Sequence, residues 1–364
     1  MATTIEIAKS LLSPPGNTIQ EHLDFIGMSQ AELAERMGRP KEKINDIIKG
    51  REPITTATAF QLDKVLGIPA SFWLNREKTY RKEIYELQQQ EELANEKDWL
   101  SAFPVNEMRK FAWLPDTKEK HILVDNLLKF FSVASTDEWE RIYVDEEVSV
   151  AFKISLAHTQ SPHAISAWLR KGEIQAKEIE IAEFDKKKFK DALYEIKELA
   201  FLMPDDFTQQ LQNICAKCGV ATVFTQNLPK APISGATRWF HNKPIIQLSG
   251  RFRTNDHFWF TFFHEAAHII LHGKKDVFLE NVEGTEIDQA KEEEANAFAA
   301  KVLIEDKDWK EIVNNLPLMP LETERYAKKL RIAPGIIVGR LQHEDLVSKA
   351  FGNDLKTKIE LFNS

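Results

Sequence analysis

Two histidines and a glutamate within residues 263–273 have the types and spacing of a metal site. The segment reads FHEAAHIILHG, with His264 and His268 four residues apart and Glu265 directly after the first histidine. On a helix, residues four apart lie on one face about one turn apart, so both imidazoles can bind one cation. A neighbouring glutamate can deprotonate water that the cation activates. The spacing therefore predicts a zinc site with Glu265 as the general base.

A zinc ion used in catalysis takes a third ligand from the protein and keeps one position open. His272 follows in the same segment, but eight residues of continuous helix span about 12 Å. It therefore cannot join the first two histidines on one ion. Gly273 comes next and is expected to end the helix. We expect His272 to form a hydrogen bond at the helix end.

A carboxylate on a second helix is the better candidate for the third ligand. Residues 286–305, EIDQAKEEEANAFAAKVLIE, carry three consecutive glutamates before an apolar stripe. Glu292 precedes Ala295 by three residues and Ala299 by seven, which places it on the buried face of the predicted helix. Glu293 and Glu294 are rotated away and are expected in solvent. The predicted zinc ligands are therefore His264, His268 and Glu292.

The sequence also indicates the elements that must position these residues. Apolar side chains surround the histidines, which predicts a buried helix over about 255–272. GVATVF (219–224) and KPIIQLS (243–249) are short and rich in β-branched residues, which predicts two or three strands before that helix. Residues 101–215 are mostly helical in pattern. The expected fold class is mainly α with a small β-sheet (α+β).

Other polar residues near the predicted site have less specific patterns. Arg238, His241, Arg251 or His257 could stabilise the oxyanion of a tetrahedral intermediate, and the sequence does not choose among them. Cys215 and Cys218 form a lone C-x-x-C without further ligands, which favours a structural role. The C-terminal stretch AKKLRIAPGIIVGRLQHE has the outline of a helix-turn-helix. Its exposed charge is low, so we expect it to pack beside the core.

The N-terminal residues 18–80 contain short helical patterns separated by glycines. Residues 29–37 and 40–49, joined at Gly38, have the geometry of a helix-turn-helix motif, whose second helix can lie in a DNA groove. Ser29 and Glu32 are placed for a capping box at the first of these helices. A charged, Gln-rich run over 76–100 then predicts a long exposed helix that leads out of this domain.

Charge is distributed unevenly along the 364 residues. The chain has a formal net charge of −8, but residues 17–82 hold 11 Lys and Arg against 9 Asp and Glu. Glu42 could accept a hydrogen bond from cytosine, and Asn45 could pair with adenine. Contacts to phosphates could come from the following residues: Gln30, Arg39, Lys41, Lys43, Lys49 and Arg51.

The remaining composition bounds the setting of the protein. The sequence contains no run of about 18 apolar residues, the length needed to span a membrane. The N-terminus lacks the pattern of a secretory signal. Two cysteines cannot form a disulfide framework, which favours a reducing interior. We expect a cytoplasmic protein whose metal site is built from His and Glu.

Two stretches resemble known families. SQAELAERMGRPKEKINDIIKGREPITTATAFQLDKVLGIPASFWLN resembles Xre/Cro helix-turn-helix regulators, and in particular HigA-like antitoxins, over residues 15–80. HEAAHIILHG followed by E-x-x-A-N-x-F-A resembles the ImmA/IrrE zinc metallopeptidases, over about 150–345. That resemblance implies zinc binding by the two histidines and Glu292, with Glu265 as general base. Family members cleave helix-turn-helix repressors. This chain departs from the usual motif by carrying Ala267 in place of glycine.

The sequence thus predicts three regions: a helix-turn-helix DNA-binding domain over 1–82, a helical connector over 83–150 and a zincin-like metallopeptidase domain over 151–364. The expected function is that of a regulator which binds operator DNA as a homodimer and cleaves a protein, such as a repressor, with zinc. The alternative is an antitoxin-like autorepressor that binds a partner toxin, with the peptidase domain acting as a sensor or scaffold.

Overall fold

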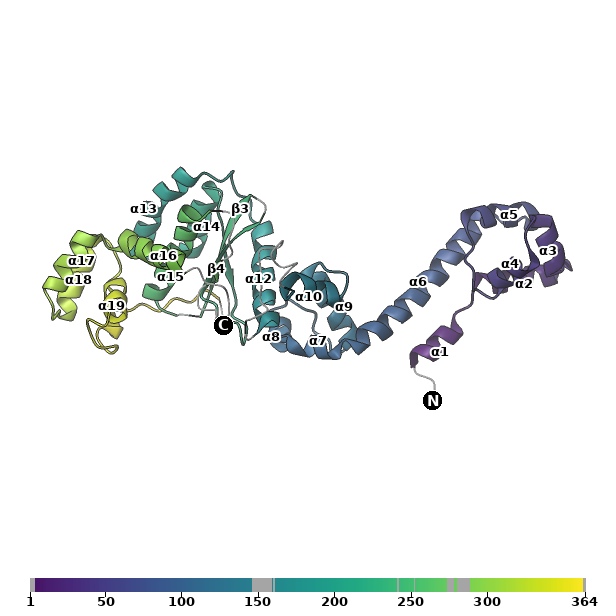
Figure 1. Cartoon of the computed structure of the whole chain (residues 1–364), viewed down its shortest axis with the longest axis horizontal. Coiled ribbons are helices and arrows are strands. Elements are labelled where there is room, and N and C mark those ends of the chain that lie inside the picture. The colour runs from purple at the N-terminus through teal and green to yellow at the C-terminus, as the bar shows by residue number, and fades with distance from the viewer. Residues whose placement is uncertain are drawn as a thin grey trace. The chain divides into compact units, whose positions relative to one another are not determined.

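The computed structural model describes residues 4–145, 159, 161–240, 242–251, 253–273, 278–279 and 289–362 (Figure 1). It forms two compact units. The first comprises the residues up to Asp98 together with Lys118–Asp125, and the second comprises Trp99–Thr117 and the residues from Asn126 onward. The predicted domain boundary at 150/151 lies outside the described residues. Helices predominate and one small sheet is present, so the α+β prediction is confirmed.

The first unit is a bundle of five short helices and one long helix, α6 (Ala70–Asn95), among its described residues. Its helix-turn-helix pair is α3 (Gln30–Met37) and α4 (Lys41–Ile48). The Ser29 hydroxyl accepts a hydrogen bond from the Glu32 amide at 3.1 Å, which caps α3. The Glu32 carboxylate binds Arg36 at 2.6 Å. The other helices of this unit are α1 (Thr4–Leu11), α2 (Pro15–Ile26), α5 (Thr56–Leu66) and α6 (Ala70–Asn95).

The apolar positions of these short helices form one core. Leu33, Ile44, Leu62 and Trp73 are among its buried side chains and come from α3, α4, α5 and α6. Gly38 ends α3 with φ +64°, a backbone conformation that favours glycine. The structure therefore confirms the helix-turn-helix geometry that the breaks in the sequence indicated. The predicted long helix is also present, as α6.

Further helices precede the sheet. A cluster of aromatic rings joins several of these helices through edge-to-face and stacked contacts. Its members include Trp99, Phe103, Trp139 and the imidazole of His163. Burial of such rings contributes strongly to packing. The helices are α7 (Lys97–Ala102), α8 (Val105–Lys110), α9 (Lys120–Phe131), α10 (Thr136–Tyr143), α12 (Pro162–Lys177), α13 (Lys186–Leu202) and α14 (Phe207–Lys217).

The sheet is mixed, with strand order β1-β3-β2-β4. The parallel pair is β1 (Ala221–Thr225) and β3 (Lys243–Ser249). β2 (Gly235–Phe240) runs antiparallel to β3 and to the two-residue β4 (Phe278–Leu279). The predicted strands are present, and β4 is an addition.

Two helices cover opposite faces of the sheet (Figure 1). Helix α15 (Asn255–Leu271) packs on β2 and β3, and α12 packs on β1 and β3. Alternation along the strands sends Arg238 and Gln247 towards α12, where they bind the carbonyls of Leu169 and Trp168. Thr237 points the other way and binds a carbonyl of α15.

The remaining helices enclose α15. Helix α16 (Gln289–Leu303) and α19 (Pro334–His343) both pack against it. Buried Ile337 and Leu341 of α19 belong to the same core, so the predicted packing of the C-terminal segment is confirmed. α17 (Asp306–Asn314), α18 (Pro320–Leu330) and the 3₁₀ turn η1 (Asn353–Leu355) complete this region. No helix among the described residues is both long and apolar enough to cross a membrane.

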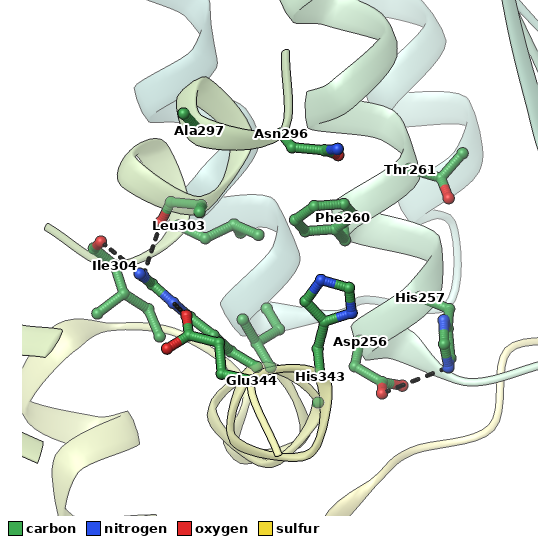
Figure 2. A pocket seen from close by; sticks show the side chains of 14 residues that line it. Asp256, His257, Phe260, Thr261, Asn296, Ala297, Leu303, Ile304, His343 and Glu344 are labelled. Carbon is green, nitrogen blue, oxygen red and sulfur yellow. Dashed lines mark hydrogen bonds and ion pairs between the residues drawn. The ribbon is translucent and has the colours of Figure 1, made fainter. Parts of the chain in front are cut away.

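Helices α15, α16 and α19 border a cavity of about 350 Å³ (Figure 2). Its lining is mostly apolar and includes Phe260, Leu303 and Ile304. His257 and His343 lie at its polar side. Cavities of this size and lining are typical of sites that take small ligands or side chains.

Candidate metal centre

Helix α15 places the predicted metal site in the interior of the second unit. Its residues are apolar on nearly all sides, as expected of a helix enclosed by sheet and helices. His264, Glu265 and His268 are buried among them. The helix ends at Leu271, and Gly273 follows with φ +75°. Two imidazoles and a carboxylate in such surroundings require polar partners.

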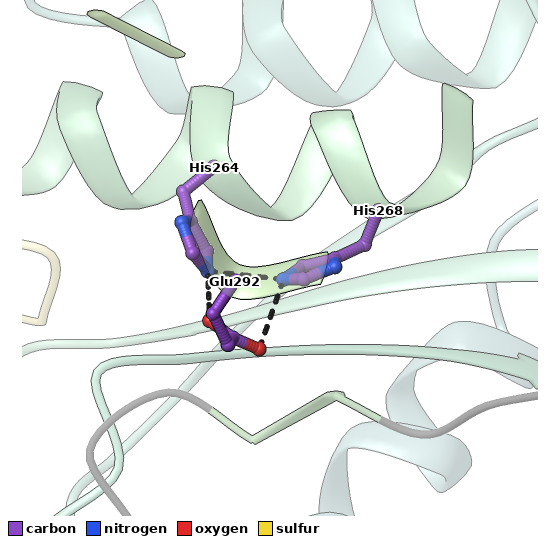
Figure 3. A group of neighbouring side chains, drawn as sticks. All are labelled: His264, His268 and Glu292. Atoms are coloured by element: carbon purple, nitrogen blue, oxygen red, sulfur yellow. Dashed lines mark hydrogen bonds and ion pairs between the residues drawn. The ribbon is translucent and has the colours of Figure 1, made fainter. Parts of the chain in front are cut away.

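The structure brings together the three residues proposed as ligands (Figure 3). The Nε2 atoms of His264 and His268 are 3.0 Å apart. One oxygen of Glu292 lies 3.1 Å from Nε2 of His264, and the other lies 3.5 Å from Nε2 of His268. Glu292 comes from the first turn of α16, and its carboxylate lies below the two imidazole rings in this view. Three side chains from two helices therefore bring potential ligand atoms within 4.8 Å of one another.

The environment favours the uncharged form of the second histidine. Burial is the main cause that lowers the pKa of His268 to about 2, and the neighbouring His264, His272 and Lys291 contribute to the same shift. His268 is therefore a neutral imidazole near pH 7. This is the form that binds metal ions, because one ring nitrogen then keeps its lone pair.

Polar groups on two helices contact the outer nitrogens of these rings. Nδ1 of His264 is 3.0 Å from Oδ1 of Asn296, and Nδ1 of His268 is 3.0 Å from Nδ1 of His272. His272 in turn places its Nε2 3.1 Å from Oε2 of Glu294. The predicted hydrogen bonding of His272 at the helix end is thus present.

Sequence reasoning missed two of these contacts. Glu294 is largely exposed, as expected, but it also binds His272. Asn296 is not among the residues that the sequence predicted for the site. It follows Glu292 by four residues and so lies on the same face of α16, a spacing that could have identified it.

Glu265 lies between α15 and the sheet. Its side chain approaches Gly235 of β2 so closely that a methyl group at residue 235 would lie 2.6 Å from Oε1. Its main-chain carbonyl accepts a hydrogen bond from Thr237 Oγ1 at 2.9 Å. The SGAT segment of the sequence therefore positions this glutamate through a residue without a side chain and through a hydroxyl.

The four candidates for oxyanion stabilisation have different positions. Arg238 points to α12, on the opposite face of the sheet from α15. It therefore cannot stabilise an oxyanion at the three proposed metal ligands. Arg251 binds the carbonyl of Pro232. His257 lines the cavity beside α15, and His241 lies outside the described residues.

The cysteine pair has the properties expected of a structural role. Cys215 lies in α14 and Cys218 directly after it, and both are free, buried thiols. Burial raises the pKa of Cys215 to about 12. Within the part of the chain that the structure describes, the one group of three potential metal ligands is that of His264, His268 and Glu292.

The residues expected to contact DNA lie on or beside α3 and α4. Lys41, Glu42 and Lys49 are exposed. Gln30 donates to Gln20 at 2.5 Å, and Arg39 donates to Gln61 at 2.6 Å, so both are held against neighbouring helices.

The charges of α4 are partly compensated within the unit. Lys43 pairs with Glu52 at 3.0 Å, and Arg51 pairs with Asp46 at 2.6 Å. Arg51 also approaches Oδ1 of Asn45 at 3.4 Å. The positive charge available to phosphates on this helix therefore comes chiefly from its two ends.

Comparisons with known proteins match both units. Residues 26–73 match the helix-turn-helix family model, and residues 216–333 match the peptidase M78 model, the IrrE N-terminal-like domain. Among solved structures, an addiction module antidote protein of the HigA family from Coxiella burnetii is 30% identical, with 23% of this chain and 91% of that chain covered and a TM-score of 0.21. An antidote protein of a plasmid maintenance system from Nostoc punctiforme is 32% identical, with 22% and 86% covered and a TM-score of 0.20. No curated protein matches the chain.

Proposed function

Because the chain joins a helix-turn-helix domain to an IrrE N-terminal-like domain, we propose that it is a DNA-binding regulator with a zinc-dependent endopeptidase domain. The observation that carries the proposal is the convergence of His264, His268 and Glu292 on one point. A cytoplasmic homodimer bound to operator DNA is the corresponding assembly. The protein substrate that we favour is a repressor.

The donor set fits zinc. Two imidazole nitrogens and one carboxylate form the protein ligands of several catalytic zinc sites. Ligand atoms around a tetrahedral zinc ion are about 3.3 Å apart. Here the two histidine Nε2 atoms are 3.0 Å apart, and each of them has its own oxygen of Glu292 at 3.1 or 3.5 Å. The outer nitrogen of each histidine contacts another side chain, so the inner nitrogens can serve as ligands.

The chemistry then divides between the ion and Glu265. A bound zinc ion would polarise the peptide carbonyl and make water acidic enough to be deprotonated near neutral pH. The Glu265 carboxylate accepts a proton from water while the water oxygen forms a bond to the carbonyl carbon. It then donates that proton to the amine nitrogen as the carbon–nitrogen bond breaks. The close approach of Gly235 limits the positions open to this carboxylate, and Thr237 binds the main chain of Glu265.

The test combines metal analysis with proteolysis of candidate helix-turn-helix repressors. Wild-type protein should contain one zinc ion per chain and cleave a substrate. Glu265→Gln should keep zinc and lose cleavage, because the amide cannot accept the proton. His264→Ala should lose both. Full activity of Glu265→Gln would exclude the mechanism, and absence of zinc from the wild type would exclude the metal site.

A second candidate function follows from the resemblance of residues 15–80 to HigA-like antitoxins. In that case the first unit binds DNA and a toxin, and the second unit acts as a sensor or scaffold. Toxin neutralisation in cells by the Glu265→Gln variant, without cleavage of any protein, would favour this candidate over the peptidase.

A further inference from the structure

We propose that His272 and Glu294 form a hydrogen-bonded relay that holds His268 in its metal-binding tautomer. Both are positioning residues, and the inference rests on the proposed metal site. The carrying observation is a continuous chain of contacts that runs from Nε2 of His268 through two imidazole rings to a carboxylate at the surface of α16.

The positions of the protons on the two imidazole rings of the relay follow from the contacts between them and from metal binding at His268 Nε2. To bind a cation through Nε2, a neutral His268 must carry its proton on Nδ1. That Nδ1 faces Nδ1 of His272 at 3.0 Å. Only one of these two nitrogens can hold a proton between them, so His272 must accept.

The assignment of His272 fixes the next contact. With its Nδ1 accepting, a neutral His272 carries its proton on Nε2, which faces Oε2 of Glu294 at 3.1 Å. The carboxylate is an acceptor only, so the bond runs from His272 to Glu294. One tautomer assignment therefore satisfies both hydrogen bonds of the relay. It leaves the lone pair of His268 Nε2 directed towards the proposed metal ligands His264 and Glu292.

Burial makes this arrangement specific. The side chains of His268 and His272 are 0% and 4% exposed, whereas that of Glu294 is 66% exposed. Water therefore has little access to the bond between the two rings, and a side chain must supply the acceptor. Glu294 joins the buried pair to the surface. Outer contacts of this kind change the metal affinity of a site by about 10- to 100-fold.

Two substitutions of nearly equal shape test the role of His272. In His272→Asn, Oδ1 takes the place of Nδ1 and still accepts from His268. In His272→Leu, a methyl group lies there and accepts nothing. The zinc dissociation constant of the full chain, measured by competition with a chromophoric chelator, should rise about 10- to 100-fold in His272→Leu. His272→Asn should bind zinc at least about tenfold more tightly than His272→Leu.

Glu294→Gln tests the outer end of the relay. It should weaken zinc binding in the wild-type background and have no effect in the His272→Asn background, where the chain of bonds to residue 294 is already interrupted. Glu293→Gln is the matched control, because it removes the same charge one residue away on the exposed side of α16. It should leave the dissociation constant unchanged.

The outcomes separate this inference from the proposed function. Equal zinc affinity of His272→Asn and His272→Leu would overturn the relay, provided that the wild type binds zinc and His264→Ala does not. A wild-type protein without zinc affinity would overturn the metal site itself and the relay with it. Thermal unfolding of each metal-free variant shows whether a loss of affinity reflects a loss of folding.

Discussion

Gly235 of β2 and Glu265 of α15 approach each other more closely than any residue with a side chain at position 235 would allow. A methyl group there would lie 2.6 Å from Oε1 and 2.9 Å from Cγ of Glu265, and 2.6 Å from a methyl carbon of Thr261. Glu265 is completely buried, so its side chain has little space to move aside. Thr237, two residues along the strand, binds the main chain of the same glutamate.

Gly235→Ala should therefore reduce peptidase activity without releasing zinc. The new methyl group must displace the Glu265 carboxylate, and a general base contributes about 10²- to 10⁴-fold to a rate. We expect kcat to fall at least tenfold, with the zinc dissociation constant unchanged. Gly250→Ala is the control, because its methyl group would contact Phe362 and Asn227 instead of Glu265. Equal kcat values for the two variants would show that the contact with Gly235 does not position the base.

The N-terminal end of α15 is attached to the C-terminal segment by a buried ion pair. Asp256 and Lys356 lie 2.6 Å apart, and their side chains are 5% and 10% exposed. Lys356→Met leaves the buried carboxylate without its cation and should lower the free energy of unfolding by about 3–5 kcal/mol. Lys329→Met removes an exposed, solvent-screened pair with Glu311 and should lower the free energy of unfolding much less. Urea unfolding followed by tryptophan fluorescence compares the two, and similar shifts would contradict the prediction.

The charges of α4 should control the salt dependence of DNA binding. Lys41 is exposed, whereas Lys43 is paired with Glu52. Lys41→Ala should weaken binding to a random-sequence duplex and reduce the slope of log K against log salt by about 1, and Lys43→Ala should have a smaller effect. Asp46→Asn should strengthen binding, because it releases Arg51. Fluorescence anisotropy at several salt concentrations measures each slope, and identical slopes for Lys41→Ala and Lys43→Ala would contradict this interpretation.

The convergence of His264, His268 and Glu292 could be predicted from the sequence because the face of a helix on which a residue lies follows from local periodicity. Spacings of four residues placed His264 and His268 on one face, and spacings of three and seven selected Glu292 on a second helix. Two helix ends could also be predicted, because glycine favours the positive φ angle that ends a helix. Gly38 and Gly273 both have such an angle.

Contacts between elements could not be predicted in the same way. Arg238 was a plausible partner for the site until strand alternation and the pairing of β2 with β3 placed it towards α12. The contact between His272 and Glu294 depends on how α15 and α16 pack, and β4 depends on pairing with a distant strand. Such relationships are set by tertiary packing, which the periodicity of one segment does not contain.

The thiol of Cys215 should be unreactive in the folded protein. Its pKa is raised to about 12 by burial, so almost no thiolate is present at pH 8. Ellman's reagent should react rapidly with both cysteines in the unfolded protein. In the folded protein it should react with each of them much more slowly. Because the unfolded pKa is about 8.5, the protonated thiol favours folding below that pH, and this contribution is lost as the pH rises towards 12. Rapid labelling of native protein at pH 8 would contradict the assignment of a structural role.

The cavity between α15, α16 and α19 should accept an apolar side chain of the peptide substrate. Phe260 precedes His264 by four residues and Asn296 follows Glu292 by four, so the cavity begins about one helical turn from these two proposed metal ligands. Ala300 lines it, and Ala300→Phe would fill part of its volume of about 350 Å³.

Filling the cavity should lower kcat/KM about 10- to 100-fold for the protein substrate that the wild type cleaves, since apolar pockets discriminate by size to this extent. Zinc affinity should not change, because Ala300 is two turns of α16 away from Glu292. Ala290→Phe provides the control, as it makes the same substitution at an exposed position of the same helix. If Ala300→Phe retained wild-type kcat/KM, the substrate would have to bind elsewhere on α15 and α16.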